Sequence, residues 1–130
     1  MKITLLIIIT FFISSVQAYE ISPFPVAEIT KEQWLAYYEE VSSEEGIEKR
    51  EYPEEELIIF VDPVKKASIA FTMKKHKAHP SWVTRYVSET GGTISINQIG
   101  YFAGKEKHFA KLFQAYAAMV KETQNKFEIK

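Results

Sequence analysis

The sequence has 130 residues, of which 46% are hydrophobic, and it contains no cysteine. Disulfide bonds and a lipid-modified cysteine anchor are therefore excluded, and the domain must be stabilised by burial alone. The formal net charge of −1 conceals a strong asymmetry. Residues 19–62 carry thirteen acidic and three basic side chains (−10), and residues 63–130 carry four acidic and twelve basic ones (+8). This division indicates either a partner-binding surface or two halves that neutralise each other within the fold.

The first 18 residues have the pattern of a secretory signal peptide. Lys2 is followed by the apolar run 4–13, and a small-x-small cleavage site ends at Ala18. The alternative is a membrane anchor, but the run is shorter than the ~20 residues that a spanning helix needs. We therefore expect export to the periplasm or the medium, in a bacterium because eukaryotic secreted domains of this size commonly use disulfides. Residues 19–130 suffice for one domain and contain no further membrane-spanning segment.

Helices are predicted near both ends of this domain. Two prolines predict an extended arm over residues 19–29. Thr30 and Gln33 then have the spacing of a capping box, and apolar residues at helical spacing predict a helix over about 31–43. The last helix is predicted after Gly104 from an apolar stripe that consists of Phe109, Leu112, Phe113, Tyr116 and Met119.

Four strands are predicted between the helices. Residues 57–61 are almost continuously apolar, as in a central strand that is covered on both faces. Residues 67–73 and 82–88 alternate between the two faces of a strand. Residues 93–102 predict the fourth strand, with a bulge near Asn97 because its apolar residues change phase. The sequence thus predicts an α+β domain, a four-stranded antiparallel meander of two hairpins with both helices packed on one face.

The segment 44–56 is predicted to be an acidic loop, because it contains seven glutamates together with Gly46 and Pro53. Three consecutive carboxylates at positions 54–56 raise the possibility of a calcium site. The segment lacks the alternating aspartates that fold around one calcium ion. We therefore expect a solvated loop rather than a calcium site.

The candidate binding surface is a basic loop between the two hairpins, together with the strand that follows it. Basic and aromatic side chains in this order can bind phosphates, acidic sugars or single-stranded nucleic acid through charge and stacking. The candidate residues are Lys74, Lys75, His76, Lys77, His79, Trp82 and Arg85. The alternative is that Trp82 belongs to the core and that the lysines only keep an exposed edge soluble.

A second interpretation uses the histidines. His76 and His79 are three residues apart and could bind zinc or copper with His108 or Glu106 as a further ligand. The motif is weak, because three lysines flank the pair and repel a cation. A hydrolase would need an activated nucleophile, and the sequence contains neither a Gly-x-Ser-x-Gly motif nor a glycine-rich phosphate-binding loop.

The sequence carries no motif set that is typical of a known family. It predicts a small, exported, non-enzymatic binding module that contacts a protein partner or an acidic envelope polymer through the basic loop. The alternative is a metal-binding protein or hydrolase that uses His76, His79 and His108, with zinc or copper as its cofactor.

Overall fold

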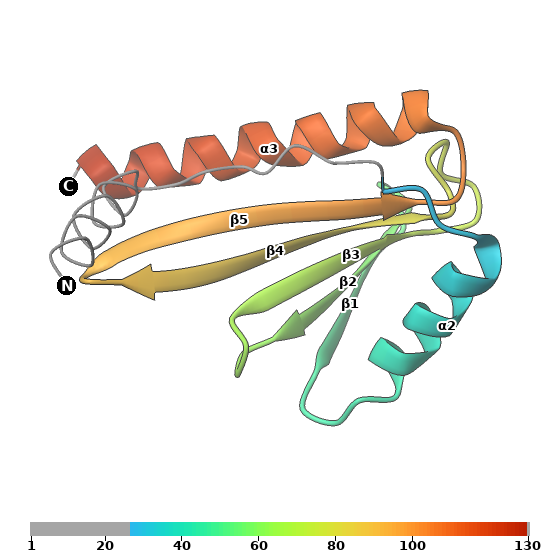
Figure 1. Ribbon diagram of the computed structural model, residues 1–130, viewed down its shortest axis with the longest axis horizontal. Helices are drawn as coiled ribbons and strands as arrows, with labels where there is room; N and C mark the ends of the chain where they lie inside the picture. The colour runs from blue at the N-terminus through green and yellow to red at the C-terminus, as the bar shows by residue number, and fades with distance from the viewer. Residues whose placement is uncertain (1–26, 130) are drawn as a thin grey trace, which may run out of the picture.

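The computed structural model describes residues 27–129 and confirms the α+β class (Figure 1). The elements follow in the order α2 (Lys31–Ser42), β1 (Glu48–Tyr52), β2 (Leu57–Asp62), β3 (Ala67–Thr72), β4 (Ser81–Thr90), β5 (Thr93–Phe102) and α3 (Glu106–Ile129). The strands form one antiparallel sheet in which each strand pairs with the next along the chain. The sheet is therefore a meander as predicted, with five strands instead of four.

The additional strand, β1, lies where the sequence predicts an acidic loop. All five of its side chains are exposed, so no apolar face marks it as a strand. Its backbone pairs with β2 in register, with Arg50 opposite Ile59. Arg50 Nε lies 3.0 Å from Glu48 Oε2 on the same strand. Charged side chains on an edge strand oppose pairing with another chain, so part of the expected loop is a protected edge of the sheet.

The sequence predicts that both helices pack on one face of the sheet, but this prediction is wrong. The two helices pack on opposite faces (Figure 1). Successive side chains of a strand alternate between the faces, and the two core clusters follow this alternation. The α2 side contains Phe60, Ile69, Phe71 and Trp82, and the α3 side contains Leu57, Ala70, Val83 and Phe102. Because β2 has apolar side chains on both faces, a cover on one face alone would leave the other in water.

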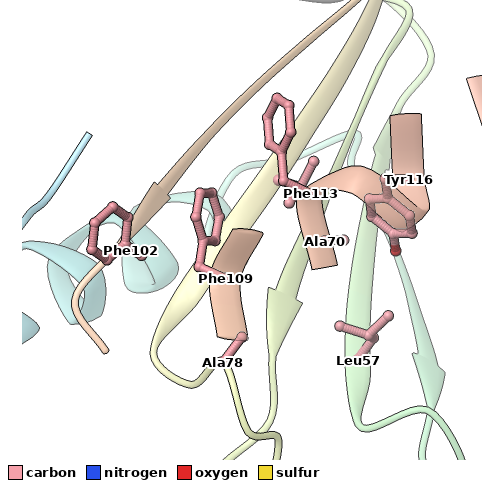
Figure 2. Packing of buried hydrophobic residues seen from close by; sticks show 8 residues of the cluster. Leu57, Ala70, Ala78, Phe102, Phe109, Phe113 and Tyr116 are labelled. Atoms are coloured by element: carbon pink, nitrogen blue, oxygen red, sulfur yellow. The ribbon is translucent and has the colours of Figure 1, made fainter. Parts of the chain in front are cut away.

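The core under α3 contains four aromatic rings, three of them from α3 itself, and they pack close to a glycine of β5. Figure 2 shows Phe109, Phe113 and Tyr116 of α3 above the sheet. Phe109 is completely buried, and its ring centre lies 5.1 Å from that of Phe102. A Cβ at Gly100 would lie 2.6 Å from Phe109 Cζ. The close approach of α3 to the sheet therefore depends on this glycine.

β5 runs without the predicted bulge, because its pairing with β4 is continuous over all ten residues. The apolar residues of β5 change phase because both faces of the sheet are covered, so that apolar side chains are buried on either face. Tyr101 packs in the cluster on the α2 side. Gln98, of the opposite phase, faces α3, where its Nε2 donates a hydrogen bond to Phe113 O (2.9 Å).

Predictions about the ends of the chain are tested only in part. The predicted signal peptide and residues 19–26 of the arm lie outside the described residues. The end of the arm pairs with β5, since Ile29 N–H donates to Phe102 O (2.8 Å) and Phe102 N–H donates to Ala27 O (3.1 Å). α3 continues to Ile129. Over residues 27–129, no helix has the length and apolar character that a membrane crossing requires.

Candidate functional site

Both helices begin at the same end of the molecule, beside the loop between β3 and β4 (Figure 1). The predicted capping box is confirmed at α2: Thr30 Oγ1 accepts from Gln33 N–H (3.0 Å), and Gln33 Oε1 accepts from Thr30 N–H (2.9 Å). This cap makes Lys31 the first residue of α2. Gly104 and Lys105 directly precede α3. Basic side chains therefore stand at both helix starts.

The basic loop, residues 73–80, is folded by its own hydrogen bonds. His76 N–H donates to Met73 O, and His79 N–H donates to His76 O, both at 3.0 Å. The His76 side chain closes the same turn, because its Nδ1 accepts from Ala78 N–H (2.9 Å). Ala78 is completely buried in the core under α3. This burial anchors the loop, while its lysines remain exposed.

His79 connects the loop to β3 and α2. Its Nδ1 lies 3.1 Å from Thr72 O and 2.9 Å from Thr72 Oγ1. Its ring meets the Trp34 indole edge-on, with 4.9 Å between the ring centres. Trp34 Nε1–H donates in turn to Ser81 O (3.0 Å). The imidazole is thus held from two sides.

The starts of the two helices and the basic loop line an open pocket of about 690 Å³, here named the lysine pocket. Its lining consists of Lys31, Lys74, Lys77, His79, Pro80, Ala103, Gly104, Lys105 and His108. Four lysines and two histidines are included, and none of the lining residues is a carboxylate. Positive groups gathered without a counter-charge raise the local potential, which attracts anions.

The helix termini and the histidines add to this electrostatic character. The N-terminus of a helix carries a partial positive charge, and α2 and α3 both begin here. Burial lowers the pKa of His79, and the nearby charges of Lys74 and Lys31 lower it further, whereas the hydrogen bond to Thr72 opposes the shift. The pKa of His108 is lowered by desolvation and then by the lysines around it. Protonation of either ring is therefore disfavoured, first by desolvation and then by the positive charges around it.

Three of the seven predicted binding residues line the lysine pocket, namely Lys74, Lys77 and His79. Lys75 lines a separate hollow beside the β1–β2 turn. His76 belongs to the turn of the loop itself and does not line the lysine pocket. The basic loop therefore divides its charged side chains between two surfaces.

The structure does not bring the other two predicted residues to the lysine pocket. Trp82 is only 7% exposed and packs in the core under α2, with its ring centre 4.4 Å from that of Tyr37. Arg85 lies on the opposite face, where its guanidinium carbon is 4.7 Å from the ring centre of Tyr116. Side chains three residues apart on a strand point to opposite faces, so these two could not share one surface.

Lys31 and Lys105 line the pocket although neither was predicted from the sequence, and His108 was predicted only as an alternative metal ligand. The sequence does contain a feature that could have pointed to both lysines, which is their position at the start of a helix. A basic side chain at the start of a helix opposes the helix dipole, and such local conflicts are expected at functional sites. Lys31 lies inside the capping box, directly after Thr30, and Lys105 directly precedes the last helix. An acidic residue at either position would stabilise the helix better.

The residues considered for metal binding and hydrolysis are not assembled for those roles. Among residues 27–129, no three His, Cys, Asp or Glu side chains are grouped so that they could hold a metal ion. His76, His79 and His108 therefore do not form the zinc or copper site considered above. Ser81 is completely buried, and its Oγ has no hydrogen-bond partner in this part of the chain. Ser81 and His79 thus do not form a nucleophile–base pair.

Comparison with known proteins gives no match, whether to protein-family models, to curated proteins or to solved structures. The function must therefore be inferred from the geometry and charge of the lysine pocket.

Proposed function

We propose that this chain is an exported, non-enzymatic binding module that holds an anionic group of a partner macromolecule in the lysine pocket. The observation that carries the proposal is the lining of that pocket, in which four lysines and two histidines occur without a carboxylate. The charge of +8 in residues 63–130 supports it, because all of the lining lysines except Lys31 belong to that half. An acidic envelope polymer and an acidic protein segment both present suitable groups.

The physical basis is concentration of charge in a partly enclosed space. Two unit charges 4 Å apart interact by about 1 kcal/mol in bulk water and by about 4 kcal/mol at the effective dielectric constant near a protein surface. Backbone N–H groups at a helix start also favour anions. The lysines remain accessible to ions from the solvent, so screening at physiological ionic strength acts over a Debye length of about 8 Å. Binding should therefore weaken as salt is added.

Charge reversal at the helix starts tests the proposal. The double variant Lys31→Glu/Lys105→Glu should bind sodium polyphosphate, heparin or polyglutamate at least about tenfold more weakly, a loss of about 1.4 kcal/mol. Titrations at about 50 mM and about 300 mM NaCl should show that the affinity falls with salt. The unmodified chain must bind at least one of these polyanions. If none of them binds, the proposal is rejected.

A matched control carries the same change of charge elsewhere. Lys65 and Lys66 are exposed in the β2–β3 turn and do not line the lysine pocket. Lys65→Glu/Lys66→Glu should retain affinity within about twofold, because the β2–β3 turn lies at the other end of the sheet from the two helix starts (Figure 1) and distant exposed charges are largely screened. An equal loss in both double variants would assign the binding to net charge and not to the pocket.

A further inference from the structure

His79 is held in one tautomer by its contact with β3. Thr72 O is a carbonyl oxygen and can only accept a hydrogen bond. From this contact we assign the proton of the neutral ring to Nδ1 of His79, 3.1 Å away. The Thr72 hydroxyl agrees with this assignment. Its oxygen accepts from Ser81 N–H (3.0 Å) and from Nδ1–H (2.9 Å), and its proton points to Ser81 O (3.2 Å). The lone pair of the neutral ring is therefore on Nε2.

Nε2 is the polar atom of this ring that remains for a ligand. The ring lines the lysine pocket, and both of its hydrogen bonds to Thr72 use Nδ1. The Trp34 indole packs against the ring and is itself fixed by its bond to Ser81 O. Turning the ring over would break the bonds to Thr72. The pocket thus combines lysine donors with one acceptor nitrogen whose tautomer is fixed.

We infer that the lysine pocket binds a phosphate monoester, whose charge the lysines neutralise and whose proton is shared with Nε2 of His79. This inference rests on the proposed function and specifies the class of anion. A phosphate monoester loses its second proton near pH 6, so a phosphate oxygen can carry or take up a proton close to neutral pH. A sulfate monoester has no such proton, and a carboxylate loses its own near pH 4. Of these anions, the phosphate complements the acceptor nitrogen best.

The charges that face His79 come from every element around the pocket. They are Lys31 from α2, Lys74 and Lys77 from the loop, and Lys105 and His108 from the start of α3. His76, which does not line the pocket, also lowers the pKa of His79 through its charge, ahead of Lys74 and Lys31. Without a ligand, burial and these charges lower the pKa of His79, so the ring is neutral and can accept a hydrogen bond. A bound phosphate places negative charge beside the ring and favours its protonated form. Binding should therefore be accompanied by proton uptake.

Calorimetry with two matched probes, phenyl phosphate and phenyl sulfate, tests the inference. At about pH 7.5, phenyl phosphate should bind with uptake of close to one proton, measured from the binding heats in two buffers of different ionisation enthalpy. Phenyl sulfate should bind at least about tenfold more weakly. The difference between the probes should narrow as the pH is lowered through the pKa of the free His79, which burial holds below its ordinary value, because the ring is then protonated without help from the ligand.

Two variants and one spectroscopic measurement isolate His79. His79→Gln should abolish the proton uptake and reduce the preference for phosphate to a few-fold, the part that the extra charge provides. Lys65→Gln is the control, since Lys65 is exposed in the β2–β3 turn and does not line the pocket, and it should retain both the proton uptake and the preference for phosphate. His79→Gln also loses the contact with Thr72. The ¹⁵N shift of Nε2 in the unmodified chain is therefore measured as well, and it should move to the protonated value when phenyl phosphate is added.

The outcomes separate this inference from the proposed function. Binding of polyanions without binding of phenyl phosphate overturns the inference alone. Binding of phenyl phosphate with neither proton uptake nor a shift of Nε2 also overturns it and leaves the proposed function in place. If neither the polyanions nor the probes bind, both fail.

Discussion

Gly104 and His79 approach each other so closely that no side chain fits between them. A Cβ at position 104 would lie 2.5 Å from His79 O and 3.4 Å from Pro80 N. Beside this contact, Ala103 N–H donates to Pro80 O (2.7 Å). The contact joins the basic loop to the start of α3, and it therefore brings the two sides of the lysine pocket together.

Gly104→Ala should consequently disturb both stability and binding. The added Cβ meets backbone atoms, which cannot move aside by changing a rotamer, so the loop or the helix start must shift. We expect a loss of about 1–3 kcal/mol in the free energy of unfolding and weaker binding of polyanions. Denaturant unfolding and the polyanion titration measure the two effects. Unchanged stability together with unchanged affinity would contradict the role assigned to this contact.

Gln98→Glu should destabilise the domain strongly at neutral pH. Gln98 is completely buried, and its Nε2 donates to Phe113 O. A carboxylate there would lose that donor and place a buried charge against a carbonyl oxygen, at a cost of about 3–5 kcal/mol. Burial would raise the pKa of the new carboxyl, so the loss should be small near pH 4 and grow as pH rises. Unfolding at both pH values measures this difference.

Asn97→Asp provides the control for that substitution. Asn97 is the neighbouring residue on the other face of β5, and its Nδ2 donates to Ser88 Oγ (3.2 Å) in an exposed position. Its replacement should change the free energy of unfolding by less than about 1 kcal/mol. An equal loss in the two variants would show that burial of Gln98 is not the cause.

Protonation of histidine should lower stability in mild acid. Burial holds the pKa of His76 and His79 in the folded state below the ordinary value of 6.5. As the pH falls below 6.5, the histidines of the unfolded chain bind protons before those of the folded chain. The stability that the neutral, buried histidines contribute is therefore lost between pH 6.5 and their pKa values in the folded state. Above pH 6.5 the contribution is fully present. Melting temperatures from about pH 5 to about pH 7.5 should show the decrease, and His79→Gln should make it shallower. An identical slope in the variant would contradict the prediction.

Trp34→Phe should weaken the attachment of α2 to the sheet. The substitution removes the indole donor to Ser81 O and part of the ring that packs against His79. Ser81 O keeps its bond from Thr72 Oγ1, so we expect a moderate loss of about 1–2 kcal/mol. Tyr38→Phe is the control, since it keeps the ring contacts of Tyr38 and the hydrogen bond that its carbonyl oxygen accepts from Ser42 Oγ. Denaturant unfolding of both variants should rank Trp34→Phe as clearly less stable.

Export should leave a shortened chain that begins at Tyr19. Expression of the full sequence in a bacterium, followed by mass spectrometry of the exported fraction, should detect loss of residues 1–18, since the small residue at position 18 suits the signal peptidase. Ala18→Arg should prevent the cleavage. Recovery of an uncleaved chain, with Met1 retained, would contradict the predicted signal peptide.

Helices and strands could be predicted from the sequence where the pattern of apolar and capping side chains is strong. The capping box at Thr30 and the apolar stripe from Phe109 to Tyr116 define two helices because helical spacing places these groups on one side. The apolar run at residues 57–61 likewise predicts a central strand. β1 was not predicted, because it pairs with β2 through its backbone and has no apolar face that would mark it in the sequence.

Only the tertiary structure determined how these parts combine. An apolar strand needs cover on both faces, and this requirement places one helix on each side of the sheet. The same packing brings the start of α2, the basic loop and the start of α3 to one end of the molecule. Lys31, Lys77 and Lys105 are far apart along the chain, and no local pattern connects them. They share a pocket because burial of the apolar faces of the two helices determines where each helix begins.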